Sequence, residues 1–89
     1  MPELKLIVLE VLVPLQISSV DLAKLISTLK NVEGVDVVVH EVERKVELAK
    51  VTIAGDSLDY DYLKVNIENT GVSIQSVERV VYGRLDNKD

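Results

Sequence analysis

The sequence predicts a single α+β domain, residues 1–89, in which four β-strands and two α-helices follow in the order βαββαβ. Three observations support this order. Apolar residues alternate or run continuously through four segments, and they recur at helical spacing in two others. Only two prolines and four glycines are present, so long uninterrupted elements are possible. Aromatic residues make up 3% of the chain, so the core must consist of Val, Ile and Leu, and β-branched residues suit a pleated sheet.

The first predicted strand extends from Leu4 to Val13. Apolar residues occupy both of its faces, and Glu10 is the one carboxylate within it. Pro14 ends the strand because proline has no N–H to donate to a neighbouring strand. A strand that is apolar on both faces needs a cover on each side.

The first helix is predicted to begin after Ser18. Asp21 follows three residues later, in a pattern that resembles a capping box. An apolar stripe then recurs at helical spacing and consists of Leu22, Leu25, Ile26, Leu29 and Val32. Asn31 and Gly34 mark the expected exit from the helix.

A β-hairpin is predicted next. Its first strand, Gly34 to Arg44, places Val38, His40 and Val42 on one face by simple alternation. Its second strand extends from Val46 to Gly55. The connection between them contains no Gly, Asn or Asp, so the pattern indicates a turn without defining its geometry.

The second helix is predicted to have Asp59 as its N-cap. Leu58 before the cap and Leu63 after it occupy the positions of a hydrophobic staple. Gly71 supplies a left-handed exit, since glycine adopts positive φ without steric conflict. These signals define both ends of the helix.

The last strand is predicted from Val72 to Tyr82. Its alternation slips between Ile74 and Val77, which indicates a β-bulge. Residues 84–89 are mostly polar and are expected to form a frayed tail.

These elements predict a ferredoxin-like sandwich. Two βαβ crossovers that share a hairpin place four antiparallel strands in one sheet, with both helices on one face. The opposite face is bare in a single chain and should be polar if water covers it. It is instead expected to carry the apolar side chains Leu4, Leu6, Val8, Leu12, Val38 and Val42. Such a patch is typical of an interface, so the sequence predicts a homo-oligomer in which another copy covers this face.

The edges of the predicted sheet favour the same conclusion. The second and fourth strands are the edges of this fold, and neither contains a proline. A head-to-tail contact through such an edge closes into a ring when the rotation between copies allows it. A ring is therefore one expected form of the oligomer.

Several stretches of the chain resemble a known family. They are residues 40–42 (HEV), 50–55 (KVTIAG), 58–61 (LDYD) and 71–83 (GVSIQSVERVVYG). Together they are similar to the small archaeal family catalogued as domain of unknown function 211. The resemblance implies an archaeal source, a ferredoxin-like fold and a homo-oligomer, with a ring among its forms. The family has no established activity, so the resemblance implies no catalytic residue.

Asp56, Asp59 and Asp61 form the sharpest polar cluster of the sequence. Three carboxylates at a helix entrance could bind a hard divalent cation such as calcium or magnesium. The alternative is structural, because acidic residues stabilise a helix N-terminus by interacting with its dipole. The cluster lacks the twelve-residue loop of an EF-hand.

Glu10, together with Glu41 and Glu43, is the second candidate. Glu10 lies among apolar residues of the predicted interface, where a carboxylate needs a partner. Lys50 of the same or a neighbouring copy is one such partner, and a cation bound by carboxylates from several copies is another. His40, the only histidine, could bind a metal or respond to pH, or it could be a surface or interface residue.

The composition narrows the classes of function. The absence of cysteine excludes disulfides and thiolate metal sites, and a net charge of −5 argues against nucleic-acid binding. No segment has the length of a membrane span or the pattern of a secretory signal, so a cytoplasmic protein is expected. No nucleophile elbow, phosphate-binding glycine loop or zinc motif is present.

The function predicted from these observations is that of a non-enzymatic homo-oligomer, a regulatory module that binds a small ligand or a divalent cation. One alternative is an enzyme with an active site between subunits, using Glu10, Glu41 or His40 as acid or base. The other is a structural ring that binds a partner protein. Fold alone does not separate these alternatives.

Overall fold

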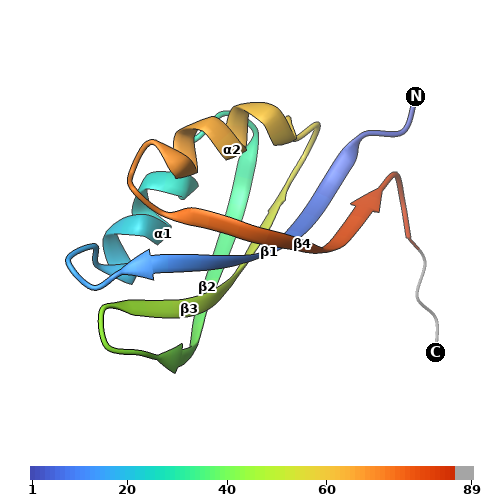
Figure 1. Cartoon of the computed structure of the whole chain (residues 1–89). Helices are drawn as coiled ribbons and strands as arrows, with labels where there is room; N and C mark the ends of the chain where they lie inside the picture. The colour runs from blue at the N-terminus through green and yellow to red at the C-terminus, as the bar shows by residue number, and fades with distance from the viewer. Residues whose placement is uncertain (86–89) are drawn as a thin grey trace.

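The computed structural model describes residues 1–85 and confirms the ferredoxin-like α+β fold. The elements are β1 (Leu4–Pro14), α1 (Ser19–Ser27), β2 (Val32–Val42), β3 (Val46–Gly55), α2 (Tyr60–Glu68) and β4 (Ser73–Tyr82). The strands form one antiparallel sheet in the order β2-β3-β1-β4. Both helices lie on the same face of this sheet, and β2 and β4 are its edges (Figure 1).

The hydrophobic core lies between the helices and the central strands. One face of β1 supplies four residues that are almost fully buried: Ile7, Leu9, Val11 and Val13. The helices contribute Leu22, Ile26, Leu63 and Ile67. The predicted staple is present, because Leu58 and Leu63 both belong to this core. The core is therefore aliphatic, as the scarcity of aromatic residues requires.

The helix caps follow the sequence closely. The Ser18 hydroxyl accepts from the backbone N–H of Val20 and Asp21, and the Asp59 carboxylate accepts from the N–H of Tyr62. Gly71 has a φ of 102°, the left-handed exit expected after α2.

The first helix ends earlier than its apolar stripe suggested. Its last residue is Ser27, and β2 begins at Val32 rather than at Gly34. Asn31 adopts a φ of 69° and makes the sharp change of direction, so the chain is already extended when it reaches Gly34. β2 also ends at Val42, two residues before the predicted Arg44.

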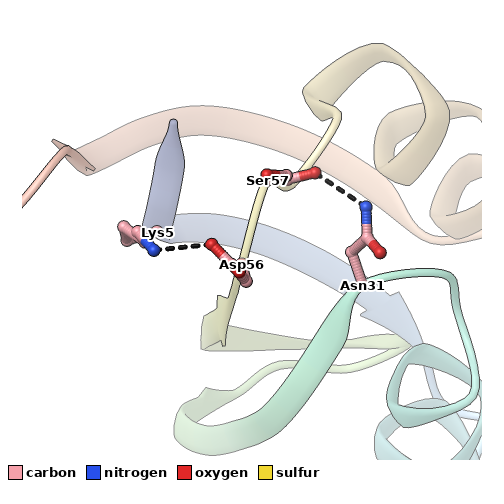
Figure 2. Close-up of polar contacts among 4 residues, drawn as sticks. All are labelled: Lys5, Asn31, Asp56 and Ser57. Carbon is pink, nitrogen blue, oxygen red and sulfur yellow. Dashed lines mark hydrogen bonds and ion pairs between the residues drawn. The ribbon is translucent and has the colours of Figure 1, made fainter. Parts of the chain in front are cut away.

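A close approach of two connections fixes one end of the sheet (Figure 2). The Asp56 backbone N–H donates to the Asn31 carbonyl at 3.2 Å, and the Asn31 side-chain amide donates to the Ser57 carbonyl at 2.9 Å. Lys5 of β1 pairs with the Asp56 carboxylate at 2.5 Å. Gly55 lies beneath these contacts, and a Cβ added to it would be 2.1 Å from the Asn31 carbonyl oxygen. Only glycine fits at this position.

Val42 does not lie on the predicted face, because β2 contains a bulge. Val39 pairs with Ala49 but Glu41 pairs with Leu48, so His40 is an extra residue with no partner on β3. One extra residue exchanges the two faces for everything that follows it. Val42 therefore lies on the helix-facing side of the sheet and not on the bare face.

A bulge in β1 corrects Leu4 in the same way. Leu4 pairs with Tyr82 and Leu6 with Val81, which leaves Lys5 as the extra residue of β1. Leu4 consequently turns toward the helices and is only 3% exposed, as part of the core. It does not belong to the bare face.

The bulge predicted in β4 is confirmed. Its pairing with β1 shifts between Ile74 and Ser76, where Gln75 is extra, and again between Val77 and Arg79, where Glu78 is extra. In residues 1–85 no helix combines the length and hydropathy needed to cross a bilayer. Of the expected frayed tail, Arg84 and Leu85 are exposed, and residues 86–89 lie outside the described part.

Candidate functional site on the open sheet face

The bare face of the sheet carries a shallow depression of about 290 Å³. Four side chains line it: Glu10, Val38, His40 and Lys50. Glu10 of β1 is paired with Lys50 of β3, and Lys50 is paired with Val38 of β2. These three residues form a row across neighbouring strands, so the sheet register itself assembles the site.

His40 lies two residues after Val38 and shares its face, and the bulge in β2 changes the face of the residues that follow it. Without the extra residue, alternation would continue and Glu41 would face the helices instead. With it, both His40 and Glu41 face the open side of the sheet. The His40 Nε2 atom lies 2.7 Å from the Glu10 Oε2 atom, across the intervening strand β3.

Glu10 therefore has its partner within the same chain, and that partner is not the expected Lys50. Its side chain is 17% exposed, against 41% for His40, so the carboxylate is the more enclosed of the two. A hydrogen bond to one carboxylate oxygen reduces the desolvation penalty of that enclosure. A carboxylate that holds an imidazole is also the arrangement by which enzymes orient a general base.

Lys50 is the exposed cation of the depression. Among residues 1–85 the ion pairs within 4.0 Å are Lys5–Asp56 and His40–Glu10. The Lys50 ammonium group is thus farther than 4.0 Å from every described carboxylate. Lys50 is exposed and belongs to the lining, and its ammonium group carries three N–H donors that a ligand could accept from.

The three aspartates near α2 have separate positions. Asp56 pairs with Lys5, and Asp59 caps the helix. Asp61 lies in the first turn of α2, where a negative charge suits the helix dipole. No group of three or more His, Asp or Glu side chains able to hold a metal ion occurs within the described residues. Glu10 joins His40 instead of these aspartates, and a cation site stays a prediction.

Glu41 and Glu43 meet at the end of β2. A hydrogen bond to Glu41, reinforced by the negative charge of that residue, raises the pKa of the Glu43 carboxyl. A proton shared between two carboxyls relieves their mutual repulsion. Both glutamates are exposed, and neither belongs to the lining of the depression.

The apolar residues predicted at the interface differ in their exposure. Leu6 and Leu12 are half-buried, and Val8 is buried between its neighbours on β3 and β4. Val38 is 50% exposed and borders the depression. The bare face therefore presents less apolar surface than strand alternation alone suggested.

A larger apolar exposure lies on the helix-facing side of β4. Val77, Val80 and Tyr82 are 44%, 49% and 62% exposed, and we call these three residues the β4 row. Val77 and Val80 pair with Leu9 and Ile7, which are buried core residues. The β4 row thus stands on the core side of the sheet without a cover.

The lengths of the elements explain this gap. Each helix has nine residues and is about 13 Å long, whereas a ten-residue strand is roughly 33 Å long. Figure 1 shows the beginning of β1 and the end of β4 extending past the helices. A comparison of the predicted helix and strand lengths would have indicated that part of β4 lies beyond the helices. The alternation of apolar residues gave no such signal.

Comparisons with known proteins cover nearly the whole fold. A profile of the family DUF211, described as an uncharacterized ArCR, matches residues 5–85. The uncharacterized protein MJ0319 of Methanocaldococcus jannaschii is 38% identical over 78 residues, which are 88% of this chain and 80% of that protein. The matched region includes all six elements apart from the first residue of β1, and it contains the whole depression.

Proposed function

The chain belongs to the archaeal DUF211 family, as its motifs indicated, and on that premise we propose that it is a homo-oligomeric, non-enzymatic binding module. Its subunits associate through β4, and its open sheet face presents the ligand site. The observation that carries the proposal is the β4 row, a strip of apolar side chains on the core side of an edge strand.

The magnitude of the apolar term indicates how large the contact must be. Complete burial of a valine-sized side chain contributes about 1.5–3 kcal/mol, so three half-exposed residues supply roughly 3 kcal/mol. Association costs an estimated 4–15 kcal/mol in lost translational and rotational freedom. The β4 row is therefore too small to hold two copies together by itself.

The backbone edge of β4 supplies the remainder in this proposal. β4 pairs only with β1 among the described strands, so the N–H and C=O groups on its outer side have no strand partner. A strand or loop of a neighbouring copy that binds there gains hydrogen bonds and covers the β4 row together. On the opposite face, Leu6, Leu12 and Val38 provide further apolar surface.

Native mass spectrometry of Val80→Glu tests the assembly. We expect the wild-type protein to give a multiple of 9.9 kDa and Val80→Glu to give mainly the monomer, because a buried carboxylate without a partner disfavours the contact. Val20→Glu is the matched control: Val20 is also an exposed valine, 66% against 49% for Val80, but it lies on α1, and its replacement should leave the mass unchanged. Circular dichroism verifies that both variants are folded.

Two further measurements extend this experiment. Leu6→Glu determines whether the bare face also takes part, since it should dissociate the oligomer only if that face is covered. Adding a chelator tests the cation hypothesis drawn from the sequence. A bound calcium or magnesium ion would be removed, and the measured mass would fall. A monomeric wild-type protein, or an oligomer that Val80→Glu leaves intact, would contradict the proposed contact.

A further inference from the structure

We propose that the depression on the open sheet face binds a small zwitterion of the α-amino acid class. The ligand's ammonium group contacts Glu10, its carboxylate contacts Lys50, and its apolar side chain packs against Val38. This inference rests on the proposed function in one respect: it identifies the ligand of the binding module.

The sheet register places the two charges at a separation that suits such a ligand. Glu10 and Lys50 are directly paired residues of β1 and β3, and Cβ atoms in such pairs lie roughly 4.5–5.5 Å apart. In an α-amino acid the nitrogen and the carboxyl carbon are bonded to the same Cα atom. Two opposite charges on the protein can therefore each meet the opposite charge of one small molecule.

The hydrogen-bonding capacity of both groups is only partly used. Glu10 accepts from His40 through Oε2, whereas no described residue donates to its Oε1 atom. The Lys50 ammonium has no described carboxylate within 4.0 Å. His40 fixes the Glu10 carboxylate and leaves one oxygen for an ammonium donor, which is the role of a positioning residue.

Charge complementarity favours a zwitterion over a simple anion or cation. Asp36 and Glu41 face the same side of the sheet as Glu10, because their partners on β3, Thr52 and Leu48, lie on that side. Together with a net charge of −5 they repel a simple anion. A simple cation could contact these carboxylates, but it would leave the Lys50 ammonium group of the lining without a partner. A molecule with one charge of each sign satisfies both conditions.

The size of the depression fits a ligand of this class. About 290 Å³ corresponds to roughly ten water molecules at about 30 Å³ each. An aliphatic amino acid such as L-leucine fills a volume of this order. The half-exposed Val38 supplies an apolar contact for its side chain.

Calorimetric titration of the full-length protein with three matched probes tests the inference. The probes are L-leucine, 4-methylpentanoate, which lacks the ammonium group, and 3-methylbutan-1-amine, which lacks the carboxylate. We expect L-leucine to bind at least tenfold more tightly than either analogue. Lys50→Met and Glu10→Gln should each weaken L-leucine binding at least tenfold, whereas the control Lys64→Met, on the exposed side of α2, should not.

Three results would overturn the inference: no binding of L-leucine, equal binding of either analogue, or unchanged binding by both depression variants. Native mass spectra of the same samples separate this inference from the proposed assembly. An oligomer that does not bind L-leucine refutes the ligand class alone. A monomer that binds L-leucine refutes the assembly alone.

Discussion

At the scale of single residues, His40 has the largest effect on the open face. It lies on the side opposite the helices, as alternation from Val38 requires, and as the extra residue of a bulge it turns Glu41 to that same side and Val42 to the other. The same geometry brings its imidazole to Glu10, two strands away. One inserted residue thus adds a carboxylate to the open face and moves Val42 to the helix-facing side.

Gly55 is a residue whose replacement should be costly. A methyl group there would overlap the Asn31 carbonyl oxygen at 2.1 Å and the Leu58 side chain at 2.7 Å, so the two connections would have to separate. We expect Gly55→Ala to lower the free energy of unfolding by about 1–3 kcal/mol, as overpacking typically does. Chemical denaturation monitored by circular dichroism measures this change.

Gly34→Ala is the matched control for that substitution. Gly34 is also a strand glycine, but a Cβ at Gly34 would meet no atom within 4 Å. Its replacement should leave stability unchanged or raise it slightly, because alanine restricts the unfolded chain. Equal losses at the two glycines would show that the Asn31 contact is not the cause.

At the scale of the elements, the N-terminal part of β1 is held to the segment after β3 by few interactions. The Leu58 N–H donates to the Leu4 carbonyl, and Lys5 pairs with Asp56 (Figure 2). The hydrogen bond to Asp56 is the main cause that raises the pKa of Lys5 above its ordinary value of 10.5. This pair joins two elements at the end of the sheet that the helices do not cover.

The pH dependence of stability should report on that pair. Because the folded-state pKa of Lys5 is raised, its contribution is fully present from neutral pH up to about 10.5 and is lost as the pH rises through the raised value. Asp56→Asn should therefore lower the melting temperature slightly at pH 8, and the difference from the wild type should shrink at strongly alkaline pH. Thermal denaturation at a series of pH values measures both.

Asp36→Asn serves as the control for this series. Asp36 is exposed on β2 and takes part in neither described ion pair. Its replacement should not alter the alkaline part of the profile. A difference for Asp56→Asn that persists unchanged at strongly alkaline pH would indicate a contribution other than the ion pair with Lys5.

At the scale of the whole molecule, the net negative charge disfavours the proposed assembly, whereas the apolar β4 row favours it. Each chain carries a formal charge of −5, so copies that associate through β4 repel one another at low ionic strength. Added salt screens that repulsion and leaves the apolar contact in place. We expect the oligomeric fraction at low protein concentration to rise between about 20 mM and 500 mM sodium chloride, where the Debye length falls several-fold.

Light scattering coupled to size-exclusion chromatography measures this fraction. Val80→Glu should remain monomeric at both salt concentrations. Salt screens the repulsion between the subunits, but it does not restore the apolar contact that the added carboxylate disrupts. A wild-type oligomer that dissociates with salt would show that ion pairs between subunits dominate the interface. The charged residues around the β4 row, rather than the row itself, would then hold the subunits together.

The sequence predicted the order of the elements because its signals are local. Ser18, Asp59 and Gly71 each act on residues within one helical turn, and alternation requires only a single strand. The faces of Leu4 and Val42 were predicted wrongly because a bulge is a property of two paired strands. The sequence indicated that each residue of the depression lies on the open face or at an interface. It did not predict that they lie close together, because this depends on the register between β1, β2 and β3.

The bulges of the outer strands also have a consequence for how a valine-rich chain avoids fibrils. His40 in β2, and Gln75 and Glu78 in β4, break the even spacing of backbone donors and acceptors along both rims of the sheet. A regular strand from another chain can match such an edge for only a few residues, so the bulges oppose edge-to-edge pairing and cross-β stacking. In the proposed assembly, only a segment whose shape matches these bulges could pair along the edge of β4.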